Sequence, residues 1–195
     1  MLPPGEAARL PDAFTYTQAI QAGVTERRLR AMTAAGLLER VARGTYLRSD
    51  TERADVELFS IAARAPDATV CLRSALSRHD LIDDIPFKLD IAIPRGRRAP
   101  RTWAPTRWHH FDRATFTLGR VDLSLTSELT MGLYTAERSI IDAFRLRHQE
   151  GTELAHAALK EWLRRRGSHP GDLMDMAAHF PKAESSIRRA LEVLL

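Results

Sequence analysis

Two groups of arginines in the sequence could bind anions. The first comprises Arg27, Arg28, Arg30, Arg40, Arg43 and Arg48, and within that interval only Glu39 is acidic. The second comprises Arg95, Arg97, Arg98, Arg101, Arg107 and Arg113, and within that interval only Asp112 is acidic. A planar guanidinium pairs with phosphate oxygens or with O6 and N7 of guanine, and clustered arginines attract polyanions. Each group could therefore contact a nucleic acid, and a solvated surface is the alternative.

The sequence offers little that could support catalysis. The lone Cys71 falls in an expected buried strand with no histidine beside it, which favours a core position over a nucleophile. Asp122 and Glu128 approximate the carboxylate spacing of metal-dependent nucleases, but Thr130 stands where such enzymes have a lysine. No glycine-rich phosphate loop is present. We expect that the protein is not an enzyme and that it has no catalytic residues, metal or cofactor. A metal-dependent nuclease is the less favoured alternative.

Two short helices are expected near the start of the chain, over residues 16–22 and 26–35. Thr15, with Gln18 three residues later, fits a capping box for the first helix. Thr25 can cap the second helix. Because about three residues that include a glycine join the two, the pair is typical of a helix-turn-helix.

The second expected helix turns its arginines outward. Leu29 and Met32 are three residues apart, so they share one face of the helix. Arg27 and Arg30 point away from that face, and Arg28 lies at its flank. Since a helix about 10 Å across fits the major groove of DNA, we interpret these three arginines as facing the groove.

A β-hairpin is expected directly after this helix. Residues 37–41 and 45–47 are β-prone, and Gly44 permits the positive φ that a tight loop requires. With Arg43 at the loop, the hairpin would be a basic wing able to reach phosphates. Residues 1–50 are thus expected to form a winged helix-turn-helix DNA-binding domain, with a protein-binding module as the alternative. The expected DNA-binding residues are Thr25, Arg27, Arg28, Arg30, Arg40, Arg43 and Thr45.

Residues 51–195 are expected to form a mixed α/β domain, which makes the whole chain α+β. Strands are predicted over 69–72, 87–93, 106–111, 115–118, 121–125 and 129–134, mainly antiparallel. Helices are predicted over 52–65, 74–81, 136–148, 152–166, 172–180 and 184–194, so the chain ends in a group of helices.

Composition is that of an ordinary soluble protein. The chain has 195 residues, of which 44% are hydrophobic and 28% charged, enough for a sizeable core. No apolar run approaches the roughly 20 residues of a membrane span. Pro3, Pro4 and Glu6 stand where a signal peptide would have an unbroken apolar segment. A single cysteine cannot form a framework of disulfides. We expect a cytoplasmic protein with no membrane partner.

Several stretches together carry a resemblance to a known family. They are Gly36-Leu37-Leu38-Glu39-Arg40-Val41, Gly44-Thr45-Tyr46, Ser74-Ala75-Leu76 with His79, Ile93-Pro94-Arg95-Gly96, and the run from Tyr134 to Arg145. On these residues the chain resembles, nearly end to end, the AbiEi family of antitoxins from type IV toxin–antitoxin systems. The last run is similar to that family's Pro-Glu-Arg-Thr helix start, with Ala136 in place of Pro and Ser139 in place of Thr.

The resemblance implies two tasks. A winged helix would bind double-stranded operator DNA and repress the protein's own operon, while residues 51–195 would counter a cognate nucleotidyltransferase-like toxin, with direct binding left open. The candidate partner surface comprises Arg95, Arg97, Arg98, Arg101, Arg138 and Asp142. Arg138 and Asp142 are four residues apart on one expected helix, which favours an internal ion pair over an antidote role. A ligand-responsive transcriptional regulator without a toxin is the alternative function.

Overall fold

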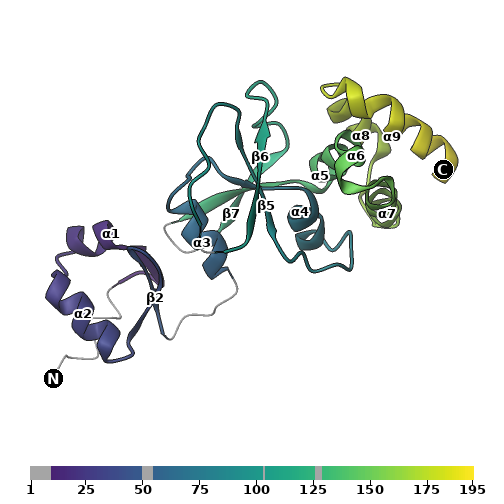
Figure 1. Ribbon diagram of the computed structural model, residues 1–195. Coiled ribbons are helices and arrows are strands. Elements are labelled where there is room, and N and C mark those ends of the chain that lie inside the picture. Colours follow the sequence, from purple (N-terminus) through teal and green to yellow (C-terminus); the bar gives the residue numbers. More distant parts are fainter. Residues whose placement is uncertain (1–9, 50–54, 103, 126–128) are drawn as a thin grey trace. The chain divides into compact units, whose positions relative to one another are not determined.

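The computed structural model describes residues 10–49, 55–102, 104–125 and 129–195 (Figure 1). The chain divides into two compact units. One, here called the N-terminal unit, comprises Met1–Pro66, Pro100–Trp103 and Leu123–Met131, and the other, the C-terminal unit, comprises the remaining residues. The boundary predicted between residues 1–50 and 51–195 falls at Asp50, which lies outside the described residues.

The described part of the N-terminal unit contains three short helices and a small sheet. Its elements are β1 (Ala13–Thr15), α1 (Tyr16–Gln21), α2 (Glu26–Ala34), β2 (Leu38–Ala42), β3 (Thr45–Arg48) and α3 (Val56–Ala62). The sheet has the order β1-β3-β2, and both pairs are antiparallel. Helices α1 and α2 and the β2–β3 hairpin thus lie close to their predicted positions. Strand β1 is not predicted, because three residues are too few to show an alternating pattern.

Local signals set the ends of the first helix. The Thr15 hydroxyl accepts a hydrogen bond from the backbone N–H of Gln18 at 3.3 Å, and the Gln18 side chain accepts one from the Thr15 N–H at 2.7 Å. This reciprocal pair confirms the predicted capping box. The helix ends before Gly23, whose φ of +83° is costly for other residues.

A small core holds α1 and α2 against the sheet. It comprises Leu10, Phe14, Ala19, Leu29, Met32 and Leu38. Leu29 and Met32 are each 1% exposed, so the helix face predicted to point inward does so. Burial of side chains of this size contributes roughly 1.5–3 kcal/mol each. The orientation of α2, and hence of the arginines on its other face, depends on this burial.

The second sheet has five strands. They are β4 (Thr69–Val70), β5 (Leu89–Pro94), β6 (Thr106–Phe111), β7 (Arg120–Ser124) and β8 (Thr130–Tyr134), in the order β6-β5-β4-β8-β7. Strands β4 and β8 run parallel, as do β5 and β6, whereas β4 and β5 run antiparallel. The chain is therefore α+β as predicted, and this sheet is mixed, because two of the three strand pairs described here are parallel where mainly antiparallel strands were expected. A period-two pattern identifies the buried face of a strand and leaves the direction of its neighbours open.

Two local predictions in this region are also wrong. Residues 115–118 form turns instead of a strand, and the carbonyl groups of Thr115 and Leu118 accept hydrogen bonds from the Arg138 guanidinium. Helix α4 (Leu72–Arg78) begins and ends earlier than the helix predicted over residues 74–81. The Ser74 hydroxyl accepts a hydrogen bond from the Asp90 N–H at 2.8 Å. In both places the hydrogen bonds join residues that are distant in the sequence.

Five helices gather at the end of the chain (Figure 1). They are α5 (Ala136–Arg145), α6 (Arg147–Glu150), α7 (Thr152–Leu163), α8 (Pro170–Ala177) and α9 (Pro181–Leu194). Helix α5 packs against α4, α7, α8 and α9 and is the centre of the largest core. The predicted C-terminal group of helices is confirmed, with the first one divided at Leu146. Among the described residues, no helix is long and apolar enough to cross a bilayer.

Candidate nucleic-acid interface

Helix α2 presents a basic face. The Thr25 hydroxyl accepts a hydrogen bond from the Arg28 N–H at 3.3 Å, so Thr25 caps the helix as predicted. Arg27 and Arg30 are exposed, opposite the buried Leu29, and Arg28 is half-buried. The cap and the buried face together hold these guanidinium groups toward solvent.

Arg30 is engaged by a weak partner. Its guanidinium pairs with the Glu26 carboxylate one helical turn away, and the two side chains are 79% and 55% exposed. Surface pairs of this kind contribute only about 0.3–0.5 kcal/mol. A phosphate group could displace Glu26 at little cost.

The β2–β3 hairpin carries Arg43 on an exposed loop. Gly44 has a φ of +72°, and its carbonyl accepts a hydrogen bond from the Tyr16 N–H at 2.8 Å. The Arg43 carbonyl accepts another from the Arg64 guanidinium at 2.9 Å. Because hydrogen bonds to the carbonyl groups of Arg43 and Gly44 fix the loop backbone, the Arg43 side chain extends from a fixed backbone position.

Thr45 does not belong to this surface, contrary to the prediction. It is 2% exposed and pairs with Thr15 across the β1–β3 ladder. Alternation along β3 places Thr45 and Leu47 on the buried face. The hydroxyl of Thr45 therefore cannot reach DNA.

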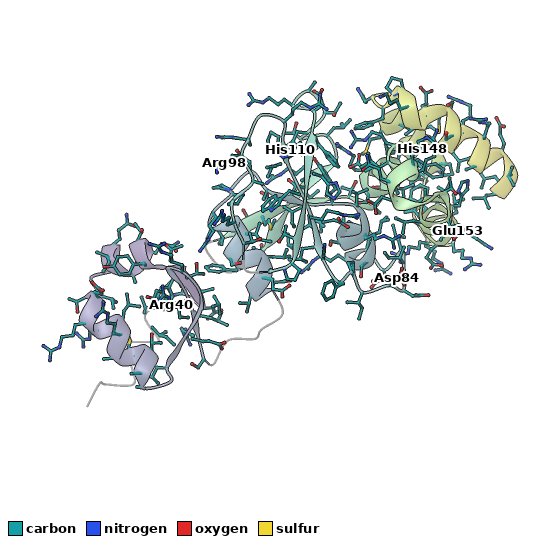
Figure 2. The ribbon with its side chains drawn as sticks, viewed as in Figure 1. Arg40, Asp84, Arg98, His110, His148 and Glu153 are labelled. Atoms are coloured by element: carbon teal, nitrogen blue, oxygen red, sulfur yellow. The ribbon has the colours of Figure 1, made fainter. Side chains whose placement is uncertain are left out.

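Five arginines surround one hollow of about 850 Å³ in the N-terminal unit. Three are predicted DNA-binding residues, Arg30, Arg40 and Arg43, with Arg40 on strand β2 (Figure 2). The other two, Arg64 and Arg101, come from outside the expected domain, and Glu26 is the acidic residue of the lining. We call this site the basic hollow. Its charge favours a polyanion.

Arg64 links the parts of the basic hollow. Besides its bond to the Arg43 carbonyl, its guanidinium donates to the Arg101 carbonyl at 3.0 Å. Sequence reasoning missed Arg64 because it stands alone at the end of an expected helix. Arg101 was assigned to the second arginine group. Only the tertiary structure brings the two residues beside the hairpin.

The rest of the first arginine group lies elsewhere. Arg27 and Arg28 are on α2 and do not line the basic hollow. Arg48 pairs with Asp12 at 3.5 Å, and its guanidinium donates to the Leu10 carbonyl. The structure therefore gathers Arg30, Arg40 and Arg43, and leaves Arg27 on the exposed face of the helix.

Comparison with known families agrees with this part of the chain. A family described as "Transcriptional regulator, AbiEi antitoxin" matches residues 6–49. The resemblance to AbiEi antitoxins is confirmed there. The match to AbiEi includes α1, α2 and the β2–β3 hairpin, and thus Arg27, Arg30, Arg40 and Arg43. No curated protein matches the chain.

The second arginine group does not form one surface, although Arg95, Arg97, Arg98 and Arg101 are exposed on a loop. Arg95 pairs with Asp112 at 3.6 Å, and Arg97 pairs with Asp67 at 2.9 Å. Arg98 is exposed on the segment after β5 (Figure 2). Arg101 lines the basic hollow of the N-terminal unit, as described above. Arg97 and Arg113 line a hollow of the C-terminal unit, so the members of this group do not all share one surface.

Arg107 belongs to an internal network instead. Its guanidinium donates to Asp90 at 2.6 Å and to Glu150 at 2.8 Å, and both carboxylates are 2% exposed. Burial tends to raise the pKa of Asp90, but hydrogen bonds from His109 and Arg107 outweigh it and hold the pKa below its ordinary value. A hydrogen bond to Asp90 raises the pKa of Arg107. This network stabilises the fold.

Arg138 and Asp142 lie in the interior and cannot be a partner surface in this structure. Both are 0% exposed, and Arg138 Nε donates to Asp142 Oδ2 at 3.0 Å, which confirms the predicted i,i+4 pair. The Arg138 guanidinium also stacks on Tyr134, 4.3 Å from the ring centroid, and on Phe180 at 4.5 Å. Their burial therefore supports the interpretation of Arg138 and Asp142 as an internal ion pair of the fold over a role as antidote residues.

The surroundings of Cys71 and Asp122 do not favour catalysis. Burial raises the pKa of the Cys71 thiol well above its ordinary value, which disfavours the nucleophilic thiolate. Asp122 pairs with Arg120 at 3.3 Å, while Glu128, its suggested partner in metal binding, lies outside the described residues. Within the described ranges, no three His, Cys, Asp or Glu side chains gather as a metal site would require.

Proposed function

We propose that this protein is a DNA-binding antitoxin of a type IV toxin–antitoxin system. In this proposal the N-terminal unit is a winged helix-turn-helix that binds operator DNA and represses the protein's own operon. Residues 51–195 counter a nucleotidyltransferase-like toxin encoded beside it. The observation that carries the DNA-binding half is the basic hollow beside α2 and the hairpin, lined by five arginines. The AbiEi match over residues 6–49 supports the antitoxin half.

The two basic elements divide the work of recognition. Helix α2 would enter the major groove, where Arg27 and Arg30 can pair with base edges. Arg40 and Arg43 would contact phosphates, which set the position of the protein and carry no sequence information directly. Arg64 and Arg101 extend this phosphate-binding surface beyond the hairpin. The winged helix is preferred over a protein-binding module because three of its arginines, Arg30, Arg40 and Arg43, line one hollow.

The first prediction concerns the Arg43→Ala variant. Loss of one phosphate contact is expected to weaken binding to all duplexes alike and to reduce the slope of log K against log salt by about 0.9. Fluorescence anisotropy of the full chain at several salt concentrations measures that slope. Arg98→Ala, which removes an exposed arginine in the C-terminal unit, is the control and should leave it unchanged. An unaltered slope for Arg43→Ala would remove this residue from the interface.

The second prediction concerns the toxin. Co-expression of the full chain with the neighbouring nucleotidyltransferase-like protein is expected to restore growth that the toxin alone arrests. The double variant Arg40→Ala/Arg43→Ala should still restore growth from an independent promoter, because its changes lie in the DNA-binding unit, while it loses repression of a reporter. Failure of the wild-type chain to restore growth would favour the alternative, a ligand-responsive regulator without a toxin.

A further inference from the structure

A second hollow, of about 600 Å³, lies within the C-terminal unit and is also basic. Three arginines line it, Arg97, Arg113 and Arg120, and Asp67 is the acidic residue of its lining. Thr117 adds a hydroxyl and Phe116 an apolar wall. None of these arginines has a role in the function proposed above.

Each of the three arginines is anchored by at least one contact, and Arg120 also pairs with Asp122 at 3.3 Å. Arg113 Nε donates to the Arg95 carbonyl at 2.9 Å, and Arg120 Nε donates to the Thr69 hydroxyl at 3.0 Å. Arg97 donates to Asp67 at 2.9 Å. In the part of the chain that the structure describes, the two terminal nitrogens of Arg113 have no acceptor. Side chains held in this way lose little conformational entropy when they bind a ligand.

The backbone leaves room for two of these side chains. A Cβ atom on Gly132 would overlap Arg120 Nε and the Thr69 hydroxyl. Gly96, with a φ of +89°, lies where a Cβ atom would be 3.4 Å from a terminal nitrogen of Arg113. Glycine at position 132 thus permits the placement of the Arg120 guanidinium along the hollow, whereas a Cβ atom at Gly96 would make only an ordinary contact with Arg113.

The charges around the hollow favour a compact, multiply charged anion. Three guanidinium groups face it, against the Asp67 carboxylate within the lining and the Asp122 carboxylate, which lies 3.3 Å from Arg120. The guanidinium fork matches phosphate oxygens, and small-ligand sites commonly have volumes of about 300–1,000 Å³. We propose that this hollow binds a small ligand that carries a phosphate or diphosphate group. The proposal does not depend on DNA binding by the N-terminal unit.

The probe for this site is inorganic pyrophosphate, titrated into the full chain by calorimetry at constant ionic strength. Arg113→Gln is expected to raise the Kd for pyrophosphate at least about tenfold, since it removes charge-assisted hydrogen bonds. The matched control Arg98→Gln removes the same charge from an exposed position outside the hollow and should change the Kd by less than about twofold. Arg97→Gln is a second variant, for use if Arg113→Gln melts at a lower temperature without ligand.

Three results would overturn the proposal. The first is that pyrophosphate produces no heat of binding to the wild-type chain up to ~10 mM, which corresponds to negligible affinity. The second is that Arg98→Gln weakens binding as much as Arg113→Gln, since the effect would then reflect net charge alone. The third is that duplex DNA binds in an Arg113-dependent manner while pyrophosphate does not, because the hollow would then serve a nucleic-acid backbone.

Discussion

Replacement of Arg138 by leucine is expected to lower the free energy of unfolding by about 3–5 kcal/mol, the cost of leaving one member of a buried ion pair without its partner. Asp142 is 0% exposed and would keep only Arg145, whose guanidinium lies 2.8 Å from its other oxygen. Arg138→Leu would also leave the carbonyl groups of Thr115 and Leu118 without the donor that now satisfies them. Urea unfolding of the full chain measures the difference.

The chain supplies a matched control for this prediction. Arg188 and Glu184 form an ion pair at the same i,i+4 spacing, 3.0 Å apart, but with side chains 59% and 34% exposed. Arg188→Leu should therefore change the free energy of unfolding by no more than about 0.5 kcal/mol. The scaffold role of Arg138 would be contradicted if its replacement cost no more than that of Arg188.

Structural features that depend on residues close together in the chain could be predicted from the sequence. Thr15 with Gln18, and Thr25, mark the starts of α1 and α2, because a capping side chain bonds to a backbone group only two or three residues away. The pair of Arg138 and Asp142 was predicted on the same basis, since four residues bring side chains together on one helix face.

Features that depend on distant partners could not be predicted. Strand β1 exists because residues 13–15 pair with β3, and its own sequence carries no alternating pattern. The parallel pairing of β5 with β6 depends on how the chain crosses between them. Thr45 was assigned to the DNA surface from its place in a motif, although the pairing of β3 turns it inward.

The surroundings of the arginines also depend on distant parts of the chain and could not be predicted from the sequence. The second arginine group is contiguous in sequence, but Arg107 is bound to two internal carboxylates and Arg101 lies in the other unit. Conversely, Arg64 is isolated in sequence and yet lines the basic hollow. A cluster along the chain becomes one charged surface only if the intervening backbone keeps its members on one side, and the pairing of Arg107 with buried carboxylates and the place of Arg101 in the other unit prevent this here.

The most direct test of the central claim compares the affinity of the full chain for two duplexes in the same buffer. One duplex carries the DNA upstream of the chain's own operon, and the other is unrelated DNA of equal length and composition. We expect the first to bind at least about 10³-fold more tightly, as specific DNA-binding proteins do, and Arg27→Ala to reduce that ratio by about 5- to 150-fold through loss of one base contact. Equal affinities of the wild-type chain for both duplexes would contradict the account.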